Sequence, residues 1–290
     1  MKCVFTVAGL GTRLLPLTKE LPKEMMPIFD LTNKGELVIK PFLQLVFEKL
    51  YDYNVRDFCF IVGSTKRAVQ DHFTPDFDLV NQLKDTQKTK IAKMLNEFFK
   101  KLENSNIVFI YQPKPIGFGD AIYRSKKFVG NESFILHAGD DIVLSKQNSH
   151  LKRLTKAFKK HNADFACLIE KVTDPQHYGV VDGSMLEPGV MKIEKSIEKP
   201  KKTKLSTAII AIYMFKPIIF KFLEMAKDPK DSEKQLARAL NIAIKKKAKI
   251  IGVMLNSNEK RIDTGTPESY AKMLLDYRKI LKNGKKFIEN

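Results

Sequence analysis

The chain has 290 residues, of which 43% are hydrophobic, and its 51 Lys and Arg against 33 Asp and Glu give a formal charge of +18 at pH 7. This length and composition are typical of a folded protein with a substantial core and exclude a disordered chain. The excess charge is spread along the chain, is mostly lysine and comes with no recognition-helix, zinc or RNP pattern. We therefore expect solvated lysine-rich surfaces and no nucleic-acid partner.

Cysteine usage and hydropathy indicate the compartment. Cys3, Cys59 and Cys167 lie in apolar, strand-like runs without metal-ligand spacing, which is typical of reduced core residues. No apolar run approaches the roughly 20 residues that cross a bilayer, and no charged-then-apolar leader is visible. The sequence thus predicts a cytoplasmic protein that does not bind membranes.

Apolar strands alternate with helical patterns through the first half of the chain, which is typical of a doubly wound sheet. The predicted strands are 3–7, 58–62, 107–111, 133–138 and 164–170, and the predicted helices are 41–54, 65–73, 119–128 and 150–162. The Lys-rich span 83–103 has apolar residues at helical spacing and predicts one inserted helix on the rim.

After residue 170 the elements become shorter. The patterns predict antiparallel strands at 178–183, 190–200 and 207–215, and helices at 232–247 and 267–281. We expect an α/β fold, a Rossmann-like doubly wound mixed β-sheet flanked by helices, with the whole chain in one domain. Its two halves are expected to serve different ligands.

The segment from Val4 to Pro27, VFTVAGLGTRLLPLTKELPKEMMP, carries the first functional signal. A buried strand ends at Gly9 and Gly11, and the carboxyl end of a strand is where open α/β sheets bind ligands. Glycines let backbone N–H groups approach an anion, while the prolines stiffen the loop that carries Arg13 and Lys23. This pattern predicts a phosphate-handling loop.

Two common phosphate motifs fit poorly. In a dinucleotide-binding G-x-G-x-x-G the third glycine would fall on Leu14, and no stretch supplies the Walker sequence G-x-x-x-x-G-K-[ST]. An oxidoreductase is thereby disfavoured. A triphosphate that is both held and polarised suits the loop better.

The run GLGTR…PKEM, residues 9–25, resembles the G-x-G-x-R…P-K signature of sugar-phosphate nucleotidyltransferases. Its form is similar to that of the bacterial and archaeal UTP–glucose-1-phosphate uridylyltransferases, or UDP-glucose pyrophosphorylases. The resemblance continues through YQPKPIGFGDAI, AGDDIV, YGVVDG, IEKP and RIDTGTPESY and covers nearly the whole chain. It implies a glycosyltransferase-A-like sheet in a single nucleotidyltransferase domain, 1–290. Residues 1–145 would mainly bind the nucleotide, and residues 146–290, with a C-terminal helix, mainly the sugar phosphate.

The resemblance also implies roles for individual residues in the first half. Arg13 and Lys23 would be catalytic, contacting the triphosphate and the transferring phosphoryl group. The implied nucleotide-binding residues are Ala8, Gly9, Gly11, Thr12, Gln112 and Gly117. An amide such as that of Gln112 can both donate to and accept from a uracil or thymine edge. Asp120 stands where uridylyltransferases often have histidine, so no catalytic role is expected of it.

Metal and sugar sites follow from the same resemblance. Asp140 and Asp263 would hold Mg²⁺, which proteins bind through one or two carboxylates together with substrate phosphates and water. Gly179, Glu198 and Lys199 would bind the sugar phosphate, with Tyr178 beside them. Because EKSIEKPKK repeats Glu-Lys, Glu194 and Lys195 remain an alternative for the last two.

The implied substrates are UTP and glucose 1-phosphate, giving UDP-glucose and pyrophosphate. A phosphomonoester has a second pKa of about 6, so its oxygen is already a nucleophile at neutral pH and no general base is needed. A thymidylyltransferase acting on the same sugar phosphate stays open as an alternative, as does the choice of sugar. The resemblance further implies a homo-oligomer, a dimer or a tetramer.

Overall fold

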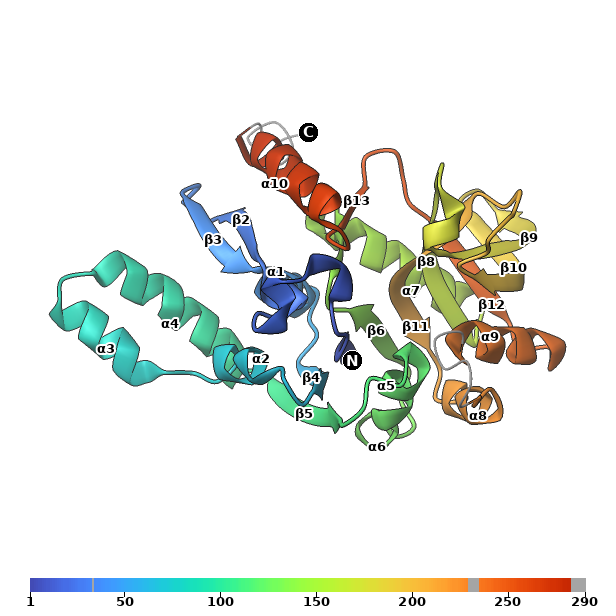
Figure 1. The fold of residues 1–290 in the computed structure, drawn as a ribbon, viewed down its shortest axis with the longest axis horizontal. Coiled ribbons are helices and arrows are strands. Elements are labelled where there is room, and N and C mark those ends of the chain that lie inside the picture. Colours follow the sequence, from blue (N-terminus) through green and yellow to red (C-terminus); the bar gives the residue numbers. More distant parts are fainter. Residues whose placement is uncertain (33, 229–234, 283–290) are drawn as a thin grey trace.

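The computed structural model describes residues 1–32, 34–228 and 235–282, with the side chains of 263 and 279–282 left out of the description. Nine of the described strands form one central sheet (Figure 1). In their order across the sheet they are β5 (Asn106–Gln112), β4 (Asp57–Gly63), β1 (Lys2–Val7), β6 (Phe134–Ala138), β11 (Thr207–Phe215), β8 (Phe165–Lys171), β12 (Ile250–Met254), β10 (Val190–Glu198) and β9 (Gly179–Glu187).

The sheet is mixed. β1 pairs in parallel with both β4 and β6, and β4 pairs in parallel with β5. β11 then runs antiparallel to β6 and to β8, and β9 and β10 form an antiparallel edge. The predicted α/β class with a mixed sheet is thus confirmed, and the loop after β1 leaves from a carboxyl edge that β1 shares with β4 and β6.

Helices cover both faces of this sheet, as the alternating pattern predicted. One apolar cluster packs α1 (Phe42–Asp52), α2 (Arg67–His72) and α7 (Ser149–Lys160) on one face. A second cluster packs α5 (Phe118–Arg124), α6 (Lys126–Val129), α8 (Ile219–Met225) and α9 (Gln235–Lys245) on the other. Among the described helices, none is both long enough and apolar enough to cross a membrane.

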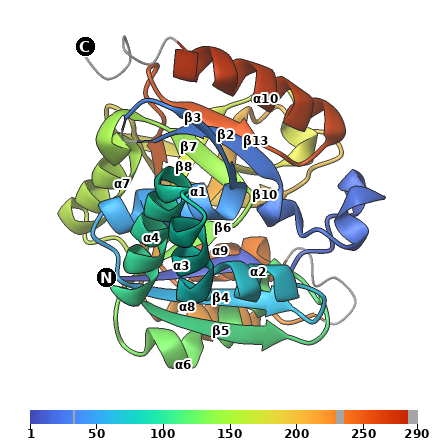
Figure 2. The ribbon, with the colours of Figure 1, turned by 90° about the vertical axis from the view of Figure 1, so that its left-hand side faces the viewer.

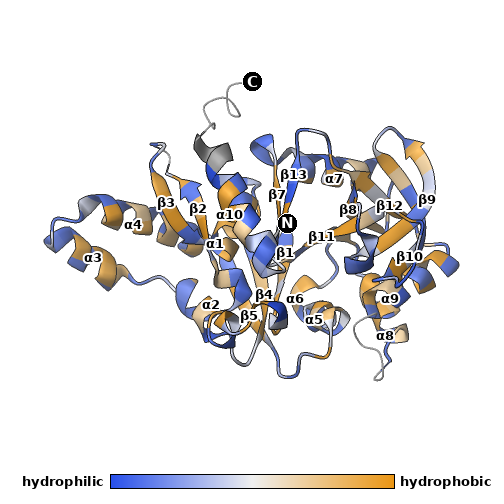
Figure 3. Ribbon diagram, turned by 45° about the horizontal axis from the view of Figure 1, so that its top comes forward, coloured by the Kyte–Doolittle hydropathy of each residue, from blue (hydrophilic) through white to orange (hydrophobic). Residues whose placement is uncertain are grey.

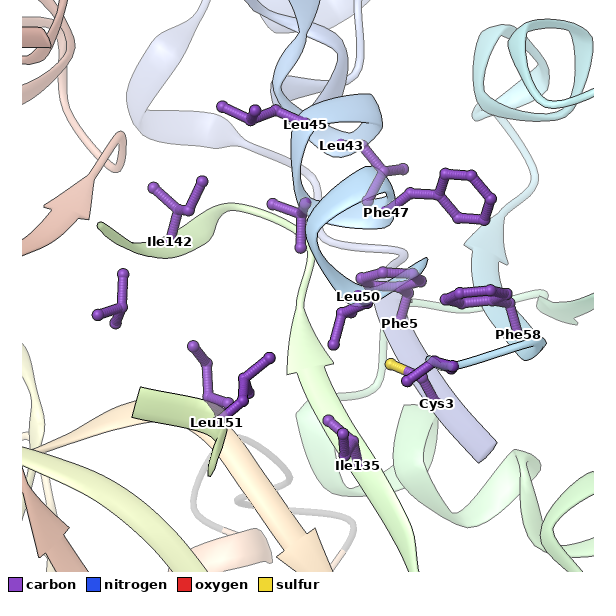
Figure 4. Packing of buried hydrophobic residues seen from close by; sticks show 14 of the residues in the cluster. Cys3, Phe5, Leu43, Leu45, Phe47, Leu50, Phe58, Ile135, Ile142 and Leu151 are labelled. Carbon is purple, nitrogen blue, oxygen red and sulfur yellow. The ribbon is translucent and has the colours of Figure 1, made fainter. Parts of the chain in front are cut away.

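The first cluster centres on α1, whose apolar residues recur at helical spacing. Leu43, Phe47 and Leu50 are fully buried, or nearly so, and meet Phe5 of β1 and Phe58 of β4 (Figure 4). The rings of Phe47 and Phe58 lie 4.7 Å apart, centre to centre. This packing anchors the strands that lead into the loop at residues 8–26.

The single helix predicted over 83–103 is confirmed over 89–103 but begins too early, because two helices occupy this region. α3 (Phe77–Asp85) begins where Asp76 accepts a hydrogen bond from the Leu79 amide, and it ends before Gln87, whose φ is 61°. A left-handed residue directly after a helix reverses the chain. α4 (Thr89–Glu103) therefore returns beside α3, and the pair stands away from the body as an arm (Figure 1 and Figure 3).

Two small sheets were not predicted. They are formed by β2 (Pro27–Leu31) with β3 (Leu37–Pro41), and by β7 (Asp141–Leu144) with β13 (Lys260–Asp263). α10 (Pro267–Lys282) lies along them (Figure 2). The hydroxyl of its Tyr270 donates to the Pro27 carbonyl at 2.7 Å. The sequence left open whether this helix packs on its own chain or between subunits. Its buried Met273 and Tyr277 pack on its own chain, and residues 283–290 lie outside the described part.

Replacing Phe47 by alanine tests the core around α1. Because this ring contacts four other aromatic rings and is fully buried, we expect Phe47→Ala to lower the free energy of unfolding by about 3–5 kcal/mol. The measurement is urea denaturation followed by circular dichroism. Leu275→Ala, at a side chain that is 65% exposed, is the control and should change stability by less than about 0.5 kcal/mol. Equal effects of the two changes would contradict this view of the core.

Candidate active site

Two adjoining cavities open beside the loop that follows β1. The larger has a volume of about 730 Å³ and the smaller about 320 Å³. Both are lined by residues 9–12, Lys23 and Phe118. Molecules bound in the two cavities would therefore meet over this loop.

The smaller cavity gathers one set of predicted residues from three places in the chain. The residues predicted to bind the nucleotide that line it are Ala8, Gly9, Gly11, Thr12, Gln112 and Gly117. Lys23, Glu24 and Asp140 add charged groups to its wall. The β1 loop, the end of β5 and the end of β6 meet here because their strands are parallel neighbours.

The larger cavity gathers the other set. It is lined by Arg13, Lys23, Tyr178, Gly179, Glu198 and Lys199. A Cβ added to Gly179 would come within 2.9 Å of Glu198 Oε2, so the two residues face each other closely. The alternative Glu194 is exposed and accepts a hydrogen bond from Lys192 at 3.1 Å. The position in the cavity therefore favours Glu198 over Glu194.

Gly11 shows why the loop needs a glycine. Its φ of 64° lies in the left-handed region, and an added Cβ would lie 3.2 Å from the Thr18 side chain. Thr18 Oγ1 in turn donates to the Gly11 carbonyl at 2.8 Å. This contact folds the loop back on itself, and short 3₁₀ turns, not an α-helix, carry Arg13 and Lys23.

Lys23 forms an ion pair with Asp140 between the two cavities. Burial works to raise the pKa of Asp140, but the Lys23 ammonium and, further away, Arg261 hold that pKa below its usual value. Burial likewise works to lower the pKa of Lys23, and Asp140 and Glu24 raise it instead. Both groups are therefore charged at neutral pH.

A second ion pair lies beneath the first. Glu24 is 1% exposed and Lys66 is 5% exposed, and their charged atoms are 3.3 Å apart. Burial raises the pKa of Glu24, against the opposing effect of Lys23 and Lys66. Glu24, although almost fully buried, lines the smaller cavity beside Lys23, so the PKE sequence places a cation and an anion next to each other in the cavity wall.

The predicted metal ligands come from adjacent segments. Asp140 lines the smaller cavity, and the backbone of Asp263 in β13 pairs with Asp141 in β7, one residue further along. The side chain of Asp263 lies outside the described part. No cluster of three or more potential metal ligands occurs among the residues whose side chains the structure describes. The carboxylate of Asp140 is of the kind that binds a divalent metal ion together with substrate phosphates and water.

Arg261 is a site residue that sequence reasoning missed. Its Nε and Nη2 donate to the two carboxylate oxygens of Asp141 at 2.7 and 2.8 Å, and Nη1 donates to Glu170 at 3.1 Å. The guanidinium also lies 4.8 Å from the centre of the Tyr178 ring, at the wall of the larger cavity. It lies two residues before Asp263 in the RIDTGTP motif, but its partners are 120 and 91 positions away.

Comparison with known proteins agrees with this geometry. The model of the family described as "Nucleotidyl transferase" matches residues 2–280. The chain belongs to this family. A Streptococcus pyogenes protein named UTP–glucose-1-phosphate uridylyltransferase 2 is 32% identical over 284 residues, covering 95% of this chain and 89% of that one. A Methanocaldococcus jannaschii protein to which the same activity is provisionally ascribed is 36% identical over 268 residues, covering 91% of this chain and 88% of that one.

Solved structures of this nucleotidyl transferase family show the same fold. A crystal structure of UDP-glucose pyrophosphorylase without ligand has a TM-score of 0.83 and 31% identity, covering 96% of this chain and 98% of that one. A second, in complex with UDP-glucose, has a TM-score of 0.79, with the same identity and coverage. The resemblance to UDP-glucose pyrophosphorylases found in the sequence is thus confirmed over nearly the whole chain.

Arg261→Lys tests how much the hydrogen bonds from the Arg261 guanidinium to Asp141 and Glu170 contribute to stability. Lysine keeps the charge but cannot bond both carboxylates in one plane, so we expect the free energy of unfolding to fall by about 2–3 kcal/mol. Urea denaturation measures it. The matched control is Arg67→Lys at the exposed pair with Asp71, where less than about 0.5 kcal/mol should be lost. If Arg261→Lys lowered the free energy of unfolding as little as Arg67→Lys does, these hydrogen bonds would contribute little to stability.

Proposed function

We propose that this chain transfers the uridylyl group of UTP to glucose 1-phosphate, giving UDP-glucose and pyrophosphate. The observation that carries the proposal is the sharing of residues 9–12 and Lys23 by the two cavities. One cavity offers the residues expected for a pyrimidine nucleotide, and the other offers those expected for a sugar phosphate. Membership of the family and the names of its relatives support the same reaction.

In this proposal the chemistry is mainly alignment and charge stabilisation. An oxygen of the sugar 1-phosphate attacks the α-phosphorus of UTP in line, and the bond from that phosphorus to the bridging oxygen of the leaving pyrophosphate breaks. Lys23 and Arg13 stabilise the negative charge on the reacting phosphates. Lys199 holds the sugar phosphate, and Glu198 accepts from sugar hydroxyls.

We include a Mg²⁺ ion, held by Asp140 and Asp263, in the proposal. When bound, it would offset part of the triphosphate charge. The Lys23 ammonium, which pairs with Asp140 in this structure, has the charge and the position to bind a phosphate instead. Its exchange from carboxylate to phosphate would then accompany substrate binding.

The division of labour along the chain is also part of the proposal. Residues 1–145 mainly bind the nucleotide and residues 146–290 mainly bind the sugar phosphate, which the linings of the two cavities support. A cytoplasmic location is supported by the three free, buried cysteines. A homo-oligomer, dimer or tetramer, is supported by two exposed apolar side chains on β3, Leu37 and Ile39.

Pyrophosphate release with Mg²⁺ and glucose 1-phosphate tests the reaction, with UTP, dTTP, CTP, ATP and GTP supplied separately. We expect UTP to be preferred and EDTA to abolish the reaction. Because Lys23 stabilises charge in the transition state, Lys23→Ala should lower kcat by about 10²–10³-fold. Lys19→Ala, in the same loop but 79% exposed, is the matched control and should leave kcat unchanged.

The triphosphate that gives the fastest pyrophosphate release distinguishes the uridylyltransferase from the thymidylyltransferase activity. Preference for dTTP would assign the chain to the thymidylyltransferase activity with the same site. Absence of release with every triphosphate and several sugar phosphates, from folded protein, would contradict the proposed reaction.

A further inference from the structure

Gln112 ends β5 and is held by two acceptors. Its side chain is buried, with 4% of the residue exposed, and it lines the smaller cavity. The amide nitrogen Nε2 donates to the Gly117 carbonyl at 3.0 Å and to Asp120 Oδ2 at 2.8 Å. Both hydrogens of the amide are therefore used inside the protein.

These two contacts decide which way the amide faces. A backbone carbonyl and a carboxylate can only accept hydrogen bonds, so the nitrogen must lie toward them and the oxygen away. No hydrogen bond to Gln112 Oε1 occurs among the described residues. Oε1 is thus the polar atom of this side chain that can accept a hydrogen bond from a ligand.

Asp120 is itself fixed in place. It lies in the first turn of α5, and Arg124 Nε donates to the same oxygen, Oδ2, at 2.8 Å. A histidine or serine at this position could donate as well as accept, and only the Gly117 carbonyl would then require the amide nitrogen to face inward. The carboxylate allows one orientation only.

Cytosine and uracil differ in the group that such an acceptor would meet. At N3, uracil carries a hydrogen and donates, whereas neutral cytosine carries a lone pair and accepts. An amide free to turn over could bond either base by presenting its oxygen or its nitrogen. An amide locked with its oxygen outward and placed opposite N3 bonds uracil and opposes the cytosine lone pair, whereas the cytosine donor, on N4, lies one ring position away.

We propose that Asp120 is a positioning residue that locks Gln112 as a hydrogen-bond acceptor, so that the smaller cavity selects uracil or thymine over cytosine. This inference rests on the proposed function, which places a pyrimidine in that cavity. The lock does not distinguish UTP from dTTP, because both bases donate from N3. It gives Asp120 a role in base selection without direct contact with the reacting atoms.

Binding of UDP and CDP, measured by titration calorimetry without sugar phosphate, tests the lock. We expect the unchanged protein to bind UDP more tightly than CDP. Asp120→Ala should lower the ratio of the two affinities by about tenfold, as expected for loss of one hydrogen bond to a charged group. Asp120→Asn should lower the ratio less than Asp120→Ala, because its carbonyl oxygen can take the place of Oδ2 but its NH2 group can also face the amide.

Arg124→Ala is the matched control. It removes the same ion pair on α5 but leaves the bond from Gln112 to Asp120, so the ratio should be unchanged. An Asp120→Ala ratio equal to that of the unchanged protein would overturn the proposal, as would an equal effect of Arg124→Ala. Failure of UDP to bind the unchanged protein would overturn it too, because the uracil base would then not occupy the cavity.

The calorimetry and the transfer assay can fail separately. Selective UDP binding that depends on Asp120, in a protein that does not transfer uridylyl groups to glucose 1-phosphate, would support the lock and contradict the proposed reaction. Transfer from UTP and CTP at similar rates, with equal UDP and CDP affinities, would support a nucleotidyl transfer reaction and overturn the lock.

Discussion

The site depends on the parallel pairing of β1 with β6. Thr6 of β1 lies opposite Ala138 of β6, so both strands end at the same edge of the sheet. The loop after β1 carries Lys23, and Asp140 follows β6 directly, which brings together two side chains 117 positions apart. Lys23 lines both cavities, so the other residues of the site are arranged around the ion pair between Lys23 and Asp140.

Several charges near this point are paired within the protein. Glu24 pairs with Lys66, and Arg261 is held by two carboxylates and lies over the Tyr178 ring. Arg13 and Lys23 line the larger cavity, where phosphates can reach them. The ion pairs hold side chains of the cavity walls in place, and cationic groups positioned in advance can stabilise developing charge without reorganisation. The same principle extends to Gln112, whose amide is oriented before any base arrives.

The local patterns predicted most of the fold, because helical and strand periodicity depends on neighbouring residues alone. The alternation in the first half and the antiparallel β9, β10 and β11 agree with the structure. The break between α3 and α4 was missed because residues 86–88 have no strong turn signal, and only the left-handed Gln87 ends the helix. The pairs β2–β3 and β7–β13 were missed because short strands become recognisable only when a partner is beside them.

The sequence by itself determined the chemistry on offer: a glycine-bearing loop with Arg13 and Lys23, acids after two strands, and motifs in an order shared with a known family. The tertiary structure decided which partner each charged group pairs with and which acceptor each polar hydrogen meets. In the folded chain Glu198 lines the larger cavity, whereas Glu194 lies on the surface. Arg261 pairs with two carboxylates, and the Gln112 amide is held in one orientation. The physical reason is that residue types and spacing are local properties, whereas an ion pair or an oriented amide depends on partners that only the packed sheet brings within reach.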